Sequence, residues 1–142
     1  MEKKKGRVTG LGGIFFKSEN RKNLMHWYSE NLGIECDDHG HTFDWRQTGE
    51  PDKMGYTVWS IFEKNTTYLD PSESDFMINF RVENLEALLE ELKEKGLKVI
   101  GEMEEFDYGK FAWVMDPEGH KIELWEPVDS VFTEMIAKSK SK

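Results

Sequence analysis

The sequence predicts an α+β protein of two tandem modules, each with one strand, one helix and three further strands. Two observations lead to this prediction. The order of strand-like and helix-like segments repeats along the chain, and short sequences of the first half recur in the second. The chain has 142 residues, 37% of them hydrophobic, which is typical of one globular domain. A half of this size buries too little surface to be stable alone, so the sheets of the two modules are expected to pair.

The first module is expected at about residues 8–63. Short apolar runs predict its four strands at residues 11–16, 34–38, 42–46 and 56–62. A helix is expected at residues 20–31, because apolar and aromatic side chains recur there at helical spacing. Gly33 follows directly, as glycine commonly does past a helix C-terminus. The stretch 48–55 is expected to be a loop.

A polar connector at residues 64–75 leads to the second module at about residues 76–127. Its strands are expected at residues 76–82, 98–103, 111–115 and 121–125. Leucines at helical spacing predict a helix at residues 84–95, and Gly96 ends it. The tail, residues 128–142, places four apolar residues at helical spacing: Val131, Phe132, Met135 and Ile136. We expect a short helix there that docks on the body of the protein or on a second chain.

Sequence letters recur in the same order as the elements. The stretch IFFKSEN (residues 14–20) matches INFRVEN (residues 78–84) in four letters, 64 residues further on. The stretch SIFE (residues 60–63) falls over ELWE (residues 123–126), 63 residues further on. Because letters and element order agree, the chain is predicted to contain an internal duplication.

The charge of the chain excludes several classes of partner. Its 28 Asp and Glu residues outnumber 19 Lys and Arg residues, which gives a net charge of -9. Such a surface repels phosphate backbones and anionic lipids, so we expect no nucleic-acid and no membrane partner. Cys36 is the single cysteine, which excludes an intrachain disulfide and fits a reducing cytoplasm, the location that we expect.

Two motifs give the chain a resemblance to a known superfamily. WYSENLGI (residues 27–34) resembles a helix end of the form aromatic-Tyr-x-x-x-Leu-Gly, and MDPEGHKIELWEP (residues 115–127) resembles an Asp-Pro-x-Gly turn followed by Ile-Glu-Leu. Both are similar to motifs of the vicinal oxygen chelate superfamily, the group of glyoxalases, bleomycin-resistance proteins and extradiol dioxygenases. The resemblance covers residues 10–127. It implies two βαβββ modules whose paired curved mixed sheets surround a cavity, and it implies a homodimer.

The second motif is also a turn on physical grounds. Asp116 is expected to bond backbone amides ahead of it, and Pro117 presets the dihedral angle of the turn. Gly119 can take a positive φ, so the chain reverses between two strands. The stretch from Asp116 to Gly119 is therefore expected to be structural.

The resemblance implies four positions at which metalloenzymes of the superfamily hold a divalent ion with His, Gln or Glu. These positions fall on Gly13, Ser60, Met77 and Glu123. Only Glu123 offers a side chain of the required kind, whereas a divalent ion needs three or more protein donors to outcompete water. We therefore expect no bound metal and no other cofactor, although the resemblance by itself would imply a divalent ion.

Strand alternation predicts which residues face the cavity. If Glu123 points inward, residues two positions away on the same strand do so too, and the internal repeat transfers this parity to the other strands. The predicted ligand-binding residues are Phe15, Ser60, Phe62, Met77, Asn79, Arg81, Lys121 and Trp125. This lining is mostly aromatic and apolar with a few polar groups, which suits a small organic ligand.

A buried carboxylate needs partners, because an isolated buried charge is costly. Three interpretations of Glu123 remain open: a structural ion pair with Arg81, Lys121 or Arg46, a general base, and an anchor for a cationic ligand group. We expect a divergent, metal-independent enzyme of the isomerase or lyase type that binds a small organic molecule, with Glu123 as its catalytic residue. The alternative is a non-catalytic protein that sequesters an antibiotic-like, cationic ligand. A third interpretation is an interaction module whose cavity is packed shut.

Overall fold

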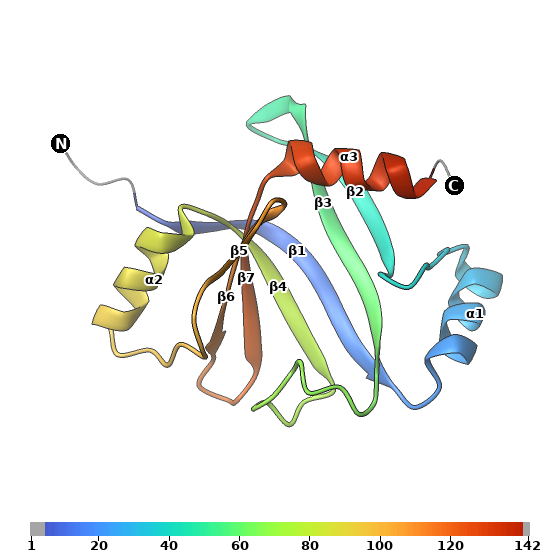
Figure 1. Ribbon diagram of the computed structural model, residues 1–142, viewed down its shortest axis with the longest axis horizontal. Coiled ribbons are helices and arrows are strands. Elements are labelled where there is room, and N and C mark those ends of the chain that lie inside the picture. The colour runs from blue at the N-terminus through green and yellow to red at the C-terminus, as the bar shows by residue number, and fades with distance from the viewer. Residues whose placement is uncertain (1–4, 141–142) are drawn as a thin grey trace.

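The computed structural model describes residues 5–140, which form one seven-stranded sheet and three helices (Figure 1). In chain order the elements are β1 (Arg7–Ser18), α1 (Arg21–Leu32), β2 (His41–Gln47), β3 (Glu50–Glu63), β4 (Phe76–Glu83), α2 (Leu85–Glu94), β5 (Glu104–Phe106), β6 (Gly109–Met115), β7 (Lys121–Pro127) and α3 (Asp129–Lys140). The predicted α+β class is confirmed. No helix within this described range is long and apolar enough to span a membrane.

The two modules join edge to edge in a single sheet. The strand order is β2-β3-β1-β4-β7-β6-β5, so the first strands of the two modules, β1 and β4, are neighbours at its centre. They pair antiparallel, and the resulting sheet is continuous and mixed. This arrangement corrects the expectation of two separate sheets that pair, because backbone hydrogen bonds between β1 and β4 make the sheets one. In Figure 1, α1 and α2 lie at opposite ends of the sheet.

The strand register reproduces the internal repeat. The parallel pair β1 and β3 places Phe15 opposite Ser60, and the parallel pair β4 and β7 places Asn79 opposite Glu123. These two strand pairs are equivalent under the repeat. Where β1 and β4 meet, Ile14 lies opposite Ile78, its own equivalent in the repeat. The two halves are therefore related by an approximate twofold axis through the middle of the sheet.

Two predicted strands are wrong. Residues 34–38 form no strand of the sheet, because the chain enters a tight turn in which Asp37 and Gly40 exchange backbone hydrogen bonds of 3.1 and 3.2 Å. Residues 98–103 run beside β6 but make only an isolated bridge, since Gly101 has a φ of 67° that interrupts an extended chain. A short strand, β5, forms only after this glycine. The first module is therefore βαββ in the structure.

The helix ends agree with the sequence, whereas one predicted loop does not. The side chain of Asn20 accepts a hydrogen bond from the backbone nitrogen of Asn23 and caps α1, which ends at Gly33 with a left-handed φ of 69°. Gly96, past the end of α2, has a φ of 81°. Most of the stretch 48–55 is strand, because β3 already begins at Glu50 and pairs with β2.

The sheet has an outer face, which α1 and α2 cover, and an opposite inner face. α2 packs on the outer face over an apolar core made of Val82, Leu85, Leu89, Ala112, Val114 and Leu124. α1 contacts it through the ring of Tyr28, which packs edge-on against Trp59. The inner face carries Phe15, Met77 and Trp113, which form a second apolar cluster. All of the predicted ligand-binding residues belong to this inner face by strand parity.

α3 crosses one end of the sheet and docks on its own chain (Figure 1). The ring of Phe132 packs against Tyr56 and Trp125, with ring centres 5.1 and 5.3 Å apart. The hydroxyls of Tyr56 and Thr133 are hydrogen-bonded. Of the two alternatives for the predicted tail helix, docking on the body of the protein is the one that the structure shows.

Candidate active site

A tight turn places Glu123 on the inner face. The Asp116 Oδ1 atom accepts hydrogen bonds of 2.9 Å from the backbone nitrogens of Glu118 and His120, and Gly119 has a φ of 87°. The predicted turn is confirmed. It leads directly into β7, which lies between β4 and β6, so Glu123 stands near the middle of the second module.

We expect Asp116→Asn to destabilise the protein at neutral pH and much less in acid. The backbone amide of His120, followed by the imidazole of the same residue and the amide of Glu118, holds the pKa of the Asp116 carboxyl below its usual range. A lowered pKa contributes stability above the ordinary value of about 4 and loses it as the pH falls through the folded-state value. Urea unfolding at about pH 7 and about pH 2 measures this difference. A difference independent of pH would contradict the argument, and Asp52→Asn, an exposed site on β3, is the control.

Three neutral groups hold the carboxylate of Glu123. The side chain is 3% exposed, and its Oε1 atom accepts a hydrogen bond of 2.6 Å from the Asn79 amide. The Oε2 atom accepts one of 2.9 Å from the Trp113 indole and a second, short one from the Tyr68 hydroxyl. Both oxygens are thus satisfied by donors that carry no charge.

Lys121 is near this carboxylate but bonds elsewhere. Its Nζ atom donates a hydrogen bond of 2.7 Å to the backbone oxygen of Tyr68 and lies 5.4 and 5.7 Å from the ring centres of Tyr68 and Trp113. Burial lowers the pKa of Lys121, against the opposing effect of the Glu123 charge. Burial also raises the pKa of Tyr68, and the Glu123 charge and hydrogen bond raise it further. Tyr68 therefore stays a protonated donor over the physiological pH range.

The ion-pair interpretation of Glu123, one of the three left open, is wrong for each of its three candidate partners. Arg81 pairs with Asp129, and Arg46 donates to the backbone oxygen of Pro51 at 3.1 Å. Lys121 donates to the Tyr68 carbonyl instead of to the carboxylate. Glu123 thus forms no ion pair with any residue in the described part of the chain. Neutral donors satisfy a carboxylate without the desolvation cost of a second buried charge.

The residues around Glu123 do not fit a divalent ion. The four positions implied by the resemblance lie on the central strands β1 and β4 and their neighbours β3 and β7. Gly13 has no side chain, and the Phe15 ring covers it. A Cβ atom added at Gly13 would lie 2.7 Å from that ring. Met77 is fully buried in the apolar cluster. No group of three or more His, Cys, Asp or Glu side chains suited to a metal occurs within residues 5–140. Glu123 would thus be a lone protein ligand.

Most of the predicted ligand-binding residues are buried by neighbouring side chains of the protein. Phe15 and Phe62 stack with ring centres 5.3 Å apart, and both contact the cluster that contains Met77 and the connector residue Leu69. Ser60 is also buried. The predicted inward orientation agrees with this burial, whereas the predicted role in binding stays a prediction.

A hollow of about 340 Å³ opens beside this cluster. Ser60, Phe62, Thr66 and Tyr68 are among its lining residues. Tyr68 is 40% exposed, and its hydroxyl reaches inward to Glu123. The Tyr68 side chain therefore separates the carboxylate from this hollow.

The remaining predicted residues form a second polar group on the inner face. Arg81 is buried between the rings of Trp45 and Trp125, with its guanidinium carbon 5.0 and 5.7 Å from the two ring centres. Its two terminal nitrogens donate to the Asp129 carboxylate at 3.0 and 2.6 Å. Gln47 donates to the same carboxylate at 3.3 Å. Asn79 and Lys121 thus lie with Glu123, whereas Arg81 and Trp125 lie apart, next to α3.

Sequence reasoning missed five of these residues: Tyr68 and Trp113 around Glu123, and Trp45, Gln47 and Asp129 around Arg81. Trp113 lies opposite Glu123 in the register of β6 and β7, so the strand parity applied to β7 would also have identified it. Tyr68 belongs to the connector, which has no periodic pattern. Asp129 belongs to the tail, where helical spacing predicts a helix but does not indicate which strand residues that helix contacts.

Comparison with known proteins agrees with this fold. The profile of a family described as "Glyoxalase-like domain" matches residues 13–125. Methylmalonyl-CoA epimerase from Mycobacterium tuberculosis is similar with a TM-score of 0.54 at 18% identity, over 89% of this chain and 93% of that one. The epimerase from Streptomyces coelicolor in complex with 2-nitronate-propionyl-CoA gives 0.62 at 15% identity, over 86% and 99%.

A glyoxalase/bleomycin resistance protein/dioxygenase superfamily member from Vibrio splendidus 12B01 gives a TM-score of 0.50 at 14% identity, over 85% of this chain and 98% of that one. The comparison with curated proteins gives no significant match. At these identities the solved structures show the fold alone. The family profile covers most of the chain, and it confirms the resemblance to the vicinal oxygen chelate superfamily. The chain therefore belongs to the family of glyoxalase-like domains.

Proposed function

We propose that this protein binds a small organic molecule on the inner face and uses Glu123 to move a proton without a metal. The observation that supports this proposal most directly is a carboxylate that is 3% exposed, satisfied by neutral donors only and without an ion pair in the described range. No ion pair within residues 5–140 neutralises this carboxylate, so a ligand that displaces one of its neutral donors can offer it a proton or a cationic group. Glu123 also stands at the one metal-ligand position of the superfamily at which this sequence keeps a side chain of the required kind.

In the proposed reaction, the ligand enters through the hollow beside Tyr68 and displaces the Tyr68 hydroxyl from Glu123. The inner face then becomes the cavity expected from the resemblance. With the Tyr68 hydroxyl displaced, the Oε2 atom takes a proton from a carbon next to a carbonyl group, and the electron pair of the broken C–H bond passes to the carbonyl oxygen of an enolate. Glu123 then returns the proton to another carbon or to the opposite face of the same carbon, which is an isomerisation. Asn79 and Trp113 hold the carboxylate in place throughout, because their bonds do not depend on Tyr68. The protonated Tyr68 can in turn donate to the oxygen of the ligand.

Glu123→Gln tests the catalytic proposal. Exchange of deuterium from D₂O into carbon acids, followed by proton NMR, is measured for methylmalonyl-CoA and for a panel of small α-substituted keto acids. We expect exchange into at least one of these compounds, reduced about 100-fold or more by the variant, because glutamine cannot accept the proton. Glu118→Gln, the same change on the exposed turn, is the control. An equal rate in the Glu123 variant and the wild type would contradict the role of Glu123.

A specific contact also favours the alternative, sequestration of a cationic ligand. The rings of Tyr68 and Trp113 already surround one cation, the Lys121 ammonium, beside a carboxylate that lacks an ion pair in the described range. In this case Glu123→Gln would weaken binding of an aromatic cation such as N-methylquinolinium and leave binding of neutral quinoline unchanged. No compound would exchange deuterium. The homodimer, the cytoplasmic location and the lack of nucleic-acid and membrane partners stay predictions.

A further inference from the structure

Arg81 occupies a built binding site for a carboxylate. The guanidinium is sandwiched between Trp45 and Trp125, and it binds both oxygens of Asp129 through parallel hydrogen bonds of 3.0 and 2.6 Å. The amide of Gln47 adds a third donor to the same carboxylate. Two donors from one planar guanidinium, with aromatic rings on its faces, is the arrangement by which arginine recognises carboxylates in binding sites.

The carboxylate in this site comes from outside the matched domain. Arg81, Trp45, Gln47 and Trp125 all lie within residues 13–125, the range of the family profile, whereas Asp129 is the first residue of α3. The matched domain thus contributes the hydrogen-bond donors and the two tryptophan rings. The helix α3, which follows the matched range, contributes the carboxylate that accepts.

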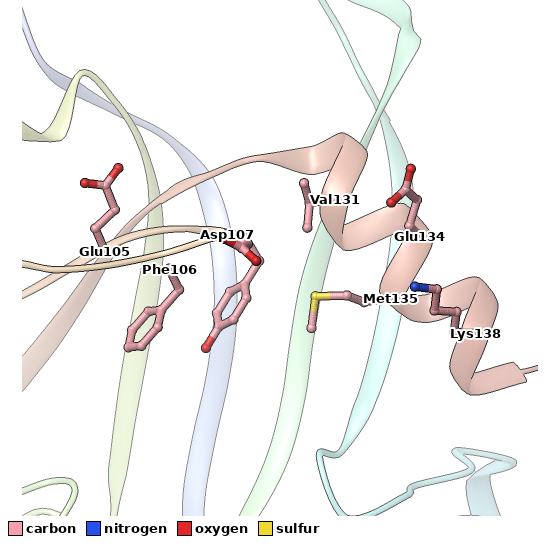
Figure 2. A pocket seen from close by; sticks show the side chains of 8 residues that line it. Glu105, Phe106, Asp107, Val131, Glu134, Met135 and Lys138 are labelled. Carbon is pink, nitrogen blue, oxygen red and sulfur yellow. The ribbon is translucent and has the colours of Figure 1, made fainter.

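α3 leaves open space on both sides. A hollow of about 620 Å³ separates it from the turn between β5 and β6, where Figure 2 shows Val131 and Met135 extending from the helix toward the side that carries Phe106. Another hollow, of about 430 Å³, lies between α3 and the segment formed by the loop at residues 35–40 and the start of β2. The docking of α3 therefore depends mainly on its first turns, through Asp129, Phe132 and Thr133.

A hollow adjoins the Arg81 site, although the Arg81 side chain itself is buried. Arg81, Trp45, Gln47 and Asp129 line a hollow of about 720 Å³, a size typical of small-molecule pockets. Along β4, Arg81 is two residues from Asn79, which bonds Glu123. Two residues of a strand span about 7 Å, so Arg81 and the Glu123 centre occupy neighbouring positions on the inner face.

We infer that Arg81 is the carboxylate-binding subsite of the ligand site and that Asp129 is a built-in competitor for it. This inference rests on the proposed function, since it assigns a carboxylate to the ligand of that same site. The ligand class is a small organic carboxylate whose reacting or cationic group lies about 7 Å from the carboxylate. A ligand carboxylate can bind Arg81 only in molecules in which Asp129 has left it. The apparent affinity for the ligand is therefore the intrinsic affinity multiplied by the fraction of molecules in which Arg81 is free.

Calorimetric titration of the full chain with phenylacetate and with its neutral analogue phenylacetamide tests this inference. We expect Asp129→Asn to bind phenylacetate about tenfold or more tightly than the wild type, and to bind phenylacetamide with unchanged affinity. Glu134→Gln, the same kind of change on an exposed position of α3, should behave like the wild type. Adding Arg81→Lys to Asp129→Asn should remove the gain, because lysine cannot form the paired bonds.

A second variant keeps both charges of the pair. Thr133→Ala removes the hydrogen bond with Tyr56 and the one to the backbone oxygen of Asp129, and it leaves the side chains of Arg81 and Asp129 unchanged. It should therefore raise phenylacetate affinity severalfold by loosening α3. Unchanged phenylacetate affinity in both variants, with native circular dichroism, would overturn the inference, and so would an equal gain for phenylacetamide. This result is independent of the proposed function, which is measured by deuterium exchange and depends on Glu123.

Discussion

Glu123→Ala is expected to lower the free energy of unfolding by about 3 kcal/mol. The change removes the acceptor of two buried donors, the Asn79 amide and the Trp113 indole, and of the Tyr68 hydroxyl. Each buried donor left without a partner costs about 1–3 kcal/mol, and the loss of a buried charge offsets part of the sum. Equilibrium unfolding in guanidinium chloride, followed by tryptophan fluorescence, measures the effect.

Glu123→Gln provides the matched control. The amide oxygen of glutamine can still accept from Tyr68 and Trp113, and its new N–H group needs an acceptor. That acceptor is present, because Asn79 Oδ1 is buried and has no hydrogen-bond partner among residues 5–140. Rotation of the Asn79 amide turns this oxygen toward residue 123. We therefore expect a loss below about 1 kcal/mol. Equal losses in the two variants would show that the network around Glu123 is not what stabilises this region.

Leu69→Ala is expected to cost about 3 kcal/mol of unfolding free energy, because Leu69 is fully buried in the cluster with Phe15, Met77 and Trp113. Leu69 is the apolar side chain through which the connector enters this cluster. Its truncation should also free the neighbouring Tyr68, so limited proteolysis within residues 64–75 should become faster. Chemical denaturation and proteolysis of the same sample measure both effects.

Leu97→Ala is the control for this prediction, since Leu97 is 41% exposed and should lose less than about 1 kcal/mol. A stable Leu69→Ala variant with unchanged proteolysis would contradict the view that the connector closes the site. A destabilised variant without faster cleavage within residues 64–75 would show that Leu69 contributes to the core without controlling the position of Tyr68.

The sequence was informative wherever a local pattern sets the structure. Strand alternation places Phe15, Asn79 and Glu123 on one face because side chains in a strand alternate regardless of what lies above them. The repeat predicted the equivalence of the two halves for a similar reason: equal segments fold alike. The two missing strands show the limit of this reasoning, since Gly101 and the Asp37 turn interrupt pairing that apolar runs alone would favour.

The contacts of the candidate site could not be predicted in the same way. Tyr68 reaches Glu123 over 55 residues of chain, from a connector without periodicity. Asp129 reaches Arg81 over 48 residues, from a tail helix whose docking position the sequence does not set. The ion-pair interpretation of Glu123 failed for a physical reason as well. Sequence reasoning pairs opposite charges, whereas a buried carboxylate is satisfied at lower desolvation cost by amide, indole and phenol donors.

The central claim is that Glu123 acts as a carboxylate held by neutral donors and not as a metal ligand. Metal analysis by plasma mass spectrometry tests it most directly, on protein purified without chelator or affinity tag and then dialysed against zinc, nickel, manganese and iron. We predict far less than one equivalent of any metal per chain, equal in the wild type and in Glu123→Ala. Near-stoichiometric metal in the wild type that is lost in Glu123→Ala would contradict the claim.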